Sequence, residues 1–225
     1  MDAKERAARS AVGEVRNGQV LGLGTGSTAM KALHVLAERI RHEGLDVIGV
    51  PTSVSTQTEA TKLGIPLTTL SEHPEIDLAF DGADQVDAGL AVIKGYGGAL
   101  LREKIVARCA KRFLVMVDAS KLAPSLCIAV PVEVLPFGVG TAKRHLESLG
   151  GKVRQRLQSN APYVSDNGNW ILDADFGTIQ DPAALAARID AIPGVMDHGL
   201  FVGMVDALHV GEATAARIVQ RPSSR

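Results

Sequence analysis

Short apolar runs alternate with amphipathic segments along the first half of the chain. Buried strands are predicted from the β-branched and apolar content of residues 19–24, 45–50, 67–70, 76–80, 90–93 and 113–117. Helices are predicted at about 28–42, 55–63 and 99–110. They are predicted from apolar residues at helical spacing and from the turn residues that flank these segments. Because strands alternate with helices, we expect a parallel sheet covered on both faces.

The pattern changes after about residue 129. Strands are predicted at 130–135, 152–157, 163–165, 170–172 and 195–202, with helices at 141–149 and 183–191. The segment Asp166-Asn167-Gly168-Asn169 is typical of a hairpin turn. The order β-α-β-β-α-β predicts a ferredoxin-like arrangement.

The predicted fold class is therefore α/β, with a Rossmann-like parallel sheet domain and a smaller ferredoxin-like α+β domain. We place the larger domain at residues 1–129 plus 203–225 and the smaller one at 130–202. A last strand and a helix are expected to return to the larger domain. Sites in such sheets lie beyond the carboxyl ends of the strands, which is where the polar motifs of this sequence fall.

Composition and charge narrow the kinds of partner. The chain has 225 residues and a net charge of -1, so an anionic ligand requires a local site, and neither nucleic acid nor a membrane is an expected partner. Cys109 and Cys127 are too few for a disulfide framework, and the N-terminus has no apolar signal-peptide core. A reducing cytoplasm is the expected location. The six histidines form no recognisable metal-ligand set, so no metal is expected.

A glycine- and hydroxyl-rich loop, Gly22 to Thr28, joins the first predicted strand to the first predicted helix. Such a loop presents backbone N–H groups and a helix N-terminus to an anion, but it is equally compatible with a tight turn capped by Ser27 or Thr28. No lysine precedes the hydroxyl pair, as a Walker A motif requires. Ser27 replaces the third glycine of a dinucleotide fingerprint, so a nicotinamide cofactor is not expected.

Carboxylates follow another predicted strand in the segment Asp81-Gly82-Ala83-Asp84. On spacing alone this segment reads as a turn, although the carboxylates could accept hydrogen bonds from sugar hydroxyls or orient a lysine. Lys121, after the strand at 113–117, is either a solvated loop residue or a second cation facing the site.

The segment from Lys94 to Lys104 combines a lysine, a glycine loop and a glutamate near a helix start. Leu101, Ile105 and Cys109 recur at helical spacing and are predicted to form the buried stripe, which leaves Glu103 off that stripe. The helix dipole favours an ionised Glu103, so it is a plausible general base. The residues alone favour the simpler interpretation of a surface Arg-Glu-Lys run.

Together these segments resemble the type A ribose-5-phosphate isomerase family. The matching motifs span about residues 20–203 in the family's order: 24–28, 81–84, 94–104, 118–121, 166–169, 192–195 and 199–201. The resemblance implies aldose–ketose isomerisation of D-ribose 5-phosphate and D-ribulose 5-phosphate through a cis-enediolate, without metal or cofactor. It also implies a homo-oligomer, a dimer or a tetramer.

By the same resemblance, Glu103 shuttles the proton and Lys94 lies beside the developing oxyanion. Asp81 and Asp84 contact sugar hydroxyls and fix that lysine. The implied substrate-binding residues are Thr25, Gly26, Ser27, Thr28, Asp81, Gly82, Ala83, Asp84, Lys94, Gly95, Tyr96, Gly97 and Lys121. One departure is Tyr96, which stands where many members carry glycine and could narrow the site or act as a lid.

Two other functions fit the same architecture. A non-catalytic sugar-phosphate sensor is the main alternative, although the first strand begins too early to leave room for a preceding helix-turn-helix. An acyl-CoA transferase with a glutamate nucleophile is the second.

Overall fold

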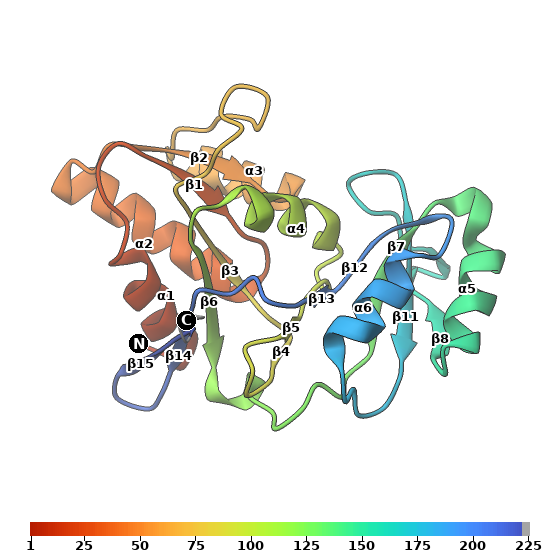
Figure 1. The fold of residues 1–225 in the computed structure, drawn as a ribbon. Coiled ribbons are helices and arrows are strands. Elements are labelled where there is room, and N and C mark those ends of the chain that lie inside the picture. The colour runs from red at the N-terminus through yellow and green to blue at the C-terminus, as the bar shows by residue number, and fades with distance from the viewer. Residues whose placement is uncertain (222–225) are drawn as a thin grey trace. The chain divides into compact units, whose positions relative to one another are not determined.

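Residues 1–221 are described here from a computed structural model of the protein (Figure 1). The chain forms two compact units. The first comprises Met1–Ala83, Arg102–Lys121 and the chain from Met204 onward, and the second comprises Asp84–Leu101 and Leu122–Gly203. This division differs from the predicted boundaries, because the segments 84–101 and 122–129 belong to the second unit.

The first unit is built on a six-stranded sheet with the order β15-β14-β6-β3-β1-β2. Its strands are β1 (Gln19–Leu23), β2 (Val47–Pro51), β3 (Leu78–Gly82), β6 (Phe113–Asp118), β14 (Ala207–Gly211) and β15 (Ala216–Gln220). Its helical elements are α1 (Ala3–Val12), α2 (Ser27–Glu43), α3 (Val54–Lys62), the larger part of α4 (Leu100–Cys109) and the 3-10 turn η1 (Ala119–Lys121). All neighbouring strands are parallel except β15, which runs antiparallel to β14.

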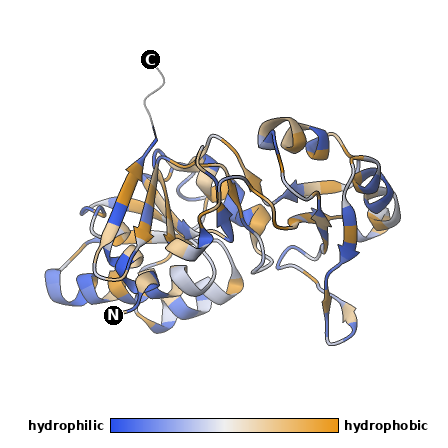
Figure 2. Ribbon diagram, turned by 90° about the horizontal axis from the view of Figure 1, so that it is seen from below, coloured by the Kyte–Doolittle hydropathy of each residue, from blue (hydrophilic) through white to orange (hydrophobic). Residues whose placement is uncertain are grey.

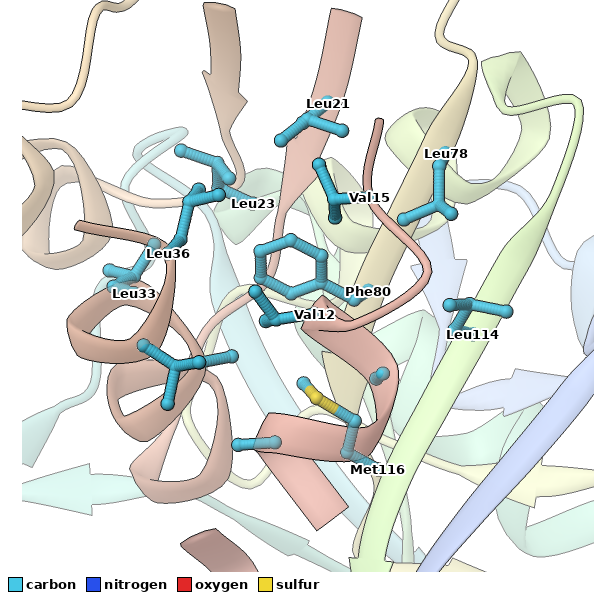
Figure 3. Packing of buried hydrophobic residues seen from close by; sticks show 14 of the residues in the cluster. Val12, Val15, Leu21, Leu23, Leu33, Leu36, Leu78, Phe80, Leu114 and Met116 are labelled. Carbon is cyan, nitrogen blue, oxygen red and sulfur yellow. The ribbon is translucent and has the colours of Figure 1, made fainter. Parts of the chain in front are cut away.

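Both faces of this sheet are covered, as the apolar pattern predicts. On one face Phe80 packs among Leu21, Leu33 and Met116, in a cluster to which the helices α1, α2 and α3 and the strands β1, β2, β3, β6 and β14 contribute; Figure 3 shows part of it. On the other face a Cβ atom at Gly22 would lie 2.4 Å from Val106 of α4, so only glycine allows this close approach. Apolar segments predominate in the strands of the sheet, whereas the helices carry polar and apolar segments side by side (Figure 2).

The second unit contains a four-stranded antiparallel sheet with the order β12-β7-β11-β8. These strands and their helices are β7 (Val130–Val134), α5 (Val139–Ser148), β8 (Lys152–Gln155), β11 (Trp170–Asp175), α6 (Pro182–Asp190) and β12 (Val195–His198). The 3-10 turn η2 (Pro136–Gly138) leads into α5. The strand order and the two helices are those of the ferredoxin-like fold, which confirms the predicted fold class.

Smaller elements complete the second unit. A three-stranded sheet is formed by β13 (Leu200–Phe201), β5 (Val92–Ile93) and β4 (Gln85–Val86), and a short hairpin by β9 (Leu157–Gln158) and β10 (Ala161–Pro162). The predicted turn at 166–169 is present, since the Ser165 amide donates to the Asn169 carbonyl and Gly168 has a φ of 79°. Among the described residues, none of the helices has the length and apolar content needed to cross a membrane.

Several predicted elements are wrong in detail. The predicted C-terminal helix does not occur in the described residues, where the antiparallel strand β15 follows β14 instead. The predicted strand 195–202 is two strands, because Gly199 separates β12 from β13 and each pairs in a different sheet. The predicted strand 67–70 is only an isolated bridge between Leu67 and Gly49. Helix α1 was not predicted.

Candidate active site

The glycine loop at the end of β1 is held by the carboxylate of Asp81, at the end of β3. Asp81 Oδ1 accepts hydrogen bonds from the backbone N–H groups of Thr25 (3.0 Å) and Gly82 (2.7 Å). A Cβ atom at Gly24 would lie 2.3 Å from this carboxyl group, so the close approach of loop and carboxylate requires glycine. Asp81 is thus a buried organiser of the loop, rather than the exposed turn residue that spacing alone favours.

The hydroxyl of Thr25 lies within a cluster of hydroxyl groups from the start of α3. Thr25 Oγ1 is 2.7 Å from Thr52 Oγ1, 2.8 Å from Ser53 Oγ and 3.1 Å from Thr56 Oγ1. The backbone N–H of Thr25 donates to Asp81. Both polar groups of this residue therefore stabilise the loop, which is a structural contribution to the predicted substrate-binding segment.

Helix α2 begins directly after the loop, and its N-cap residue is Gly26, which has no side chain to accept a hydrogen bond from the first turn. Neither Ser27 nor Thr28 is the capping residue, so the alternative of a side-chain-capped turn is wrong. Gly26 has a φ of 98°, and no atom lies within 4 Å of the position that a Cβ would take there. The first turn of α2 thus presents backbone N–H groups beside an open glycine, an arrangement that favours an anion.

Two lysines contribute positive charge around Asp118, and one of them, Lys4, also contacts the glycine loop. Lys4 Nζ of α1 donates to Ser27 Oγ at 3.0 Å. Partial burial opposes ionisation of Asp118 at the end of β6, but hydrogen bonds from Ser120 and the charges of Lys4 and Lys121 hold the pKa of Asp118 below its usual range. Sequence reasoning included Lys121 but missed Lys4, because Lys4 lies in an N-terminal helix and follows no strand.

Glu103 lies in the first turn of α4 and is buried, with only 4% of its surface exposed. The predicted buried stripe of Leu101, Ile105 and Cys109 is wrong. Ile105 is 43% exposed, whereas the buried residues of this helix are Leu100, Glu103, Val106 and Ala107. Glu103 therefore belongs to the buried face, which excludes the interpretation of a surface Arg-Glu-Lys run. The amino end of the helix favours its ionised form.

Lys94 of the second unit is also buried, with 2% exposure. Its backbone N–H donates to the Gly199 carbonyl at 2.9 Å, and its Nζ atom lies 5.6 Å from the centre of the Phe201 ring. A Cβ atom at Gly199 would lie 2.1 Å from the Lys94 carbonyl oxygen, so glycine is required at the turn between β12 and β13. That turn is what places the aromatic ring beside the ammonium group.

The glycine loop after Lys94 is fixed to Asp84 of the same unit. Asp84 Oδ2 accepts a hydrogen bond from the Tyr96 amide at 3.0 Å. Gly95 and Gly98 have φ values of 106° and 76°, but Tyr96 is not among the residues with positive φ, so its backbone accommodates a side chain. Its hydroxyl donates to the Ala129 carbonyl at 3.2 Å, so in this structure the ring has a hydrogen-bond partner within the second unit.

Apart from Glu103, which lies on the buried face of α4, the predicted site residues form two local groups. In the first unit the structure brings Thr25, Gly26, Ser27 and Thr28 together with Asp81 and Gly82. There a Cβ at Gly82 would lie 3.7 Å from Thr28 Cβ. Ala83 follows directly, and Lys121 is the last residue of η1, the 3-10 turn that follows β6. In the second unit Asp84 and the segment from Lys94 to Gly97 form one hydrogen-bonded group.

One group of side chains in the described part of the chain has donor atoms close enough to share a metal ion: Asp190, Asp197 and His198. His198 Nδ1 accepts a hydrogen bond from the Leu200 amide, and Nε2 lies 3.1 Å from Asp190 Oδ1. Because Nδ1 accepts the hydrogen bond from the Leu200 amide, a neutral ring carries its proton on Nε2, the nitrogen that faces Asp190.

The motif at 166–169 serves the interior of the second unit. The buried Glu133 of β7 accepts hydrogen bonds at Oε1 from Ser165 Oγ (2.7 Å), Asn167 Nδ2 (3.0 Å) and Asn169 Nδ2 (2.9 Å). These donors compensate the burial of a carboxylate. The motif that helped to suggest the family resemblance is thus a structural element of this unit.

Comparison with known proteins agrees with this architecture. The profile of the family described as ribose 5-phosphate isomerase A (phosphoriboisomerase A) matches residues 48–215. The chain is 47% identical to ribose-5-phosphate isomerase A of Methanosarcina acetivorans over 97% of this chain and 94% of that one. It is 52% identical to the protein of the same name from Gloeobacter violaceus, over 93% and 92% of the two chains.

Two solved structures that resemble this chain are also ribose 5-phosphate isomerases. Ribose 5-phosphate isomerase A from Methanocaldococcus jannaschii superimposes with a TM-score of 0.93 and 41% identity, covering 97% of this chain and 98% of that one. A D-ribose-5-phosphate isomerase in complex with phospho-erythronic acid has a TM-score of 0.94 and 36% identity, with the same coverage.

The fold, the polar loops at the strand ends and these matches define an enzyme of the sugar-phosphate isomerase class. The chain belongs to the ribose 5-phosphate isomerase A family.

Proposed function

We propose that this chain interconverts D-ribose 5-phosphate and D-ribulose 5-phosphate through a cis-enediolate, as a step of the non-oxidative pentose phosphate pathway. The observation that carries the proposal is the buried Glu103 in the first turn of α4, in a chain that belongs to this family. The relative solved with phospho-erythronic acid, a phosphorylated sugar acid, supports a sugar phosphate as the substrate.

Glu103 acts as the base that moves the proton. In the aldose-to-ketose direction its carboxylate removes the proton from C2, the electron pair forms the C1–C2 double bond, and the C1 carbonyl becomes an oxyanion. The same carboxyl group then returns the proton to C1, and the O2 hydroxyl proton passes to O1. The position at a helix N-terminus favours the carboxylate that the first step requires.

Lys94 stabilises the negative charge that develops on the enediolate oxygen. Its burial supports this role, since an ammonium group acts more strongly on a nearby charge where water is excluded. Asp81 and Asp84 contact sugar hydroxyls and orient this lysine. Their hydrogen bonds to the amides of Thr25, Gly82 and Tyr96 support a second contribution, which is to hold the substrate-binding loops.

The phosphate group binds at the N-terminus of α2, between Gly26 and Thr28, with Lys4 and Lys121 as its cations. Three features support this assignment: the uncapped first turn, the open position at Gly26, and the hydrogen bond from Lys4 to Ser27. A dianionic phosphate at this point meets both the helix dipole and two ammonium charges.

The cellular location, the oligomeric state and the absence of a cofactor are proposed from the sequence and the family. The enzyme acts in the cytoplasm as a homodimer or homotetramer, with small sugar phosphates as ligands and without nucleic acid or membrane partners. It requires neither metal nor cofactor. The alternative of a non-catalytic sensor finds no support in the matched relatives, which are named as isomerases.

The test is a coupled assay for ribulose 5-phosphate formed from ribose 5-phosphate, without nucleotide and after exhaustive chelation. We expect full turnover. Binding of ribose 5-phosphate without turnover would favour the sensor. A loss on chelation that one divalent ion restores would contradict the metal-free mechanism.

A further inference from the structure

Arg156 connects the four-stranded sheet of the second unit to the glycine loop that follows Lys94. On one side its Nε and Nη2 atoms pair with the two carboxylate oxygens of Asp173 on β11, with Nε 3.0 Å from Oδ2. On the other side its Nη1 donates to the carbonyl oxygens of Gly95 (2.8 Å) and Tyr96 (3.2 Å). The guanidinium group thus binds a carboxylate bidentately and still holds two successive carbonyls of the loop.

Two aromatic rings flank the same guanidinium group. Its Cζ atom lies 5.8 Å from the centre of the Tyr96 ring and 5.8 Å from that of Tyr163. The Tyr163 hydroxyl lies 3.4 Å from the Gly97 carbonyl oxygen, and a Cβ at Gly98 would lie 2.1 Å from that hydroxyl. The side chain of Arg156 is only 14% exposed, whereas Tyr96 is 49% exposed, so the guanidinium group lies on the shielded side of this cation–π contact.

The backbone of Arg156 is itself fixed. Its N–H donates to the Ile171 carbonyl at 2.8 Å, and its carbonyl accepts from the Tyr163 amide at 2.9 Å. The guanidinium group therefore projects from a rigid strand end, and its position is set by the sheet of the second unit rather than by the loop that it holds.

The contacts of Arg156 determine where the amides of the loop point. In a trans peptide the C=O and N–H groups point to opposite sides of the chain. Because Arg156 holds the Gly95 carbonyl, the Tyr96 N–H points the other way, where it donates to Asp84 Oδ2. Because Arg156 also holds the Tyr96 carbonyl, the Gly97 N–H is turned away from Arg156 as well.

We infer that Arg156, anchored by Asp173 and stacked between Tyr96 and Tyr163, is a positioning residue for the isomerase reaction. It fixes the Lys94–Gly97 loop and, through the Tyr96 amide, the carboxylate of Asp84. The inference rests on the proposed function, because its effect is on turnover of the sugar phosphate. It also assigns a purpose to Tyr96: the ring that replaces glycine here is one half of the stack.

Arginine is required by this geometry. A lysine at 156 keeps one positive charge but cannot pair bidentately with Asp173 while donating to two carbonyls, and it stacks less well on the rings. A loosened loop misplaces Asp84 and Lys94. A misplacement of about 1 Å can lower a rate by about 100-fold.

The experiment compares Arg156→Ala and Arg156→Lys with Arg154→Ala. Arg154 is the matched control, because it is an exposed arginine on β8, two residues away, and pairs across the sheet with Asp173. We expect kcat to fall by about 10- to 100-fold in both Arg156 variants, with a smaller change in KM, and Arg154→Ala to keep the wild-type values. Guanidinium ion at millimolar concentration is expected to restore part of the activity of Arg156→Ala and to leave Arg156→Lys and Arg154→Ala unchanged.

A purely structural role gives a different result. In that case the thermal midpoint falls, guanidinium does not restore kcat, and the folded Arg156→Lys variant retains normal kcat. These outcomes overturn the inference. Wild-type turnover of ribose 5-phosphate is measured first, since an inactive wild type refutes the proposed function, whereas an active wild type with normal Arg156 variants refutes only the positioning role.

Discussion

At the residue scale, the two groups proposed to act on the reacting atoms, Glu103 on the carbons and Lys94 on the enediolate oxygen, are both buried. Lys94 and Glu103 are the kinds of side chain that are almost never buried without a specific reason, because removing a charge from water is costly. The sequence identifies these residues by motif but cannot show their burial. A prediction from apolar spacing counts only apolar residues, so it cannot assign a glutamate to the buried face of a helix. For that reason it selected Leu101, Ile105 and Cys109 instead of the face that contains Glu103.

The role of Lys94 is tested by replacing it with alanine. A cation at the enediolate oxygen acts mainly in the transition state, so Lys94→Ala is expected to lower kcat far more than it raises KM. Loss of one such electrostatic contact typically lowers kcat about 100- to 1000-fold. Steady-state kinetics with ribose 5-phosphate separate the two constants. If only KM rises, Lys94 contributes to binding and not to the chemical step.

At the scale of elements, the site depends on how strands end and helices begin. Sequence reasoning predicted the strands β1, β3 and β6 and the polar segments that follow them, because strand ends in a parallel sheet carry such loops. It could not predict that Asp81 would bind the amide of Thr25, 56 positions earlier, since that contact follows from the pairing of β1 with β3. Lys4 was missed for the same reason, because α1 reaches the glycine loop only through tertiary packing.

The proposed phosphate site at the start of α2 is tested with Lys121→Ala and Lys4→Ala. Phosphate contacts are the same in the ground state and the transition state, so each variant is expected to raise KM with little change in kcat. A hydrogen bond to a charged group contributes about 1.5–3 kcal/mol, which corresponds to about 10- to 150-fold in KM. Lys62→Ala, at an exposed position of α3, is the control. A normal KM in both variants would place the phosphate elsewhere.

At the scale of the whole molecule, the two units follow the predicted fold class, but the chain crosses between them more often than the hydrophobic pattern suggests. The segment 84–101 belongs to the second unit because β5 pairs with β13, which lies more than 100 positions later in the chain. Strand β15 was taken for a helix because no short-range pattern reveals that it pairs with β14 as an edge strand. Long-range pairing of short strands therefore limits what the sequence alone predicts.

Global stability is expected to depend on His209, which joins β14 to α1. Burial lowers the pKa of this imidazole below its usual 6.5, although the charge of Glu14 opposes the shift. The unfolded chain therefore binds a proton that the folded chain excludes as pH falls below about 6.5. Stability is accordingly lost on acidification and restored as pH rises, with a slope of at most about 1.4 kcal/mol per pH unit from this residue.

Urea unfolding between pH 7.5 and pH 5.5 measures this dependence. We expect it to be weaker in His209→Gln, while His42→Gln, at an exposed position of α2, behaves like the wild type. An unchanged pH dependence in His209→Gln would assign the effect to other groups.

The measurement that tests the central claim most directly is proton exchange and turnover in the Glu103→Gln variant. Glutamine keeps the shape of the side chain but removes its basicity, so the variant is expected to fold and to bind ribose 5-phosphate while losing about 10²- to 10⁴-fold or more in turnover. In D₂O the wild type is expected to introduce deuterium at C2 of recovered ribose 5-phosphate, and the variant almost none. Near-normal turnover and exchange in Glu103→Gln would contradict the account and direct the search for the base to Asp81 or Asp84.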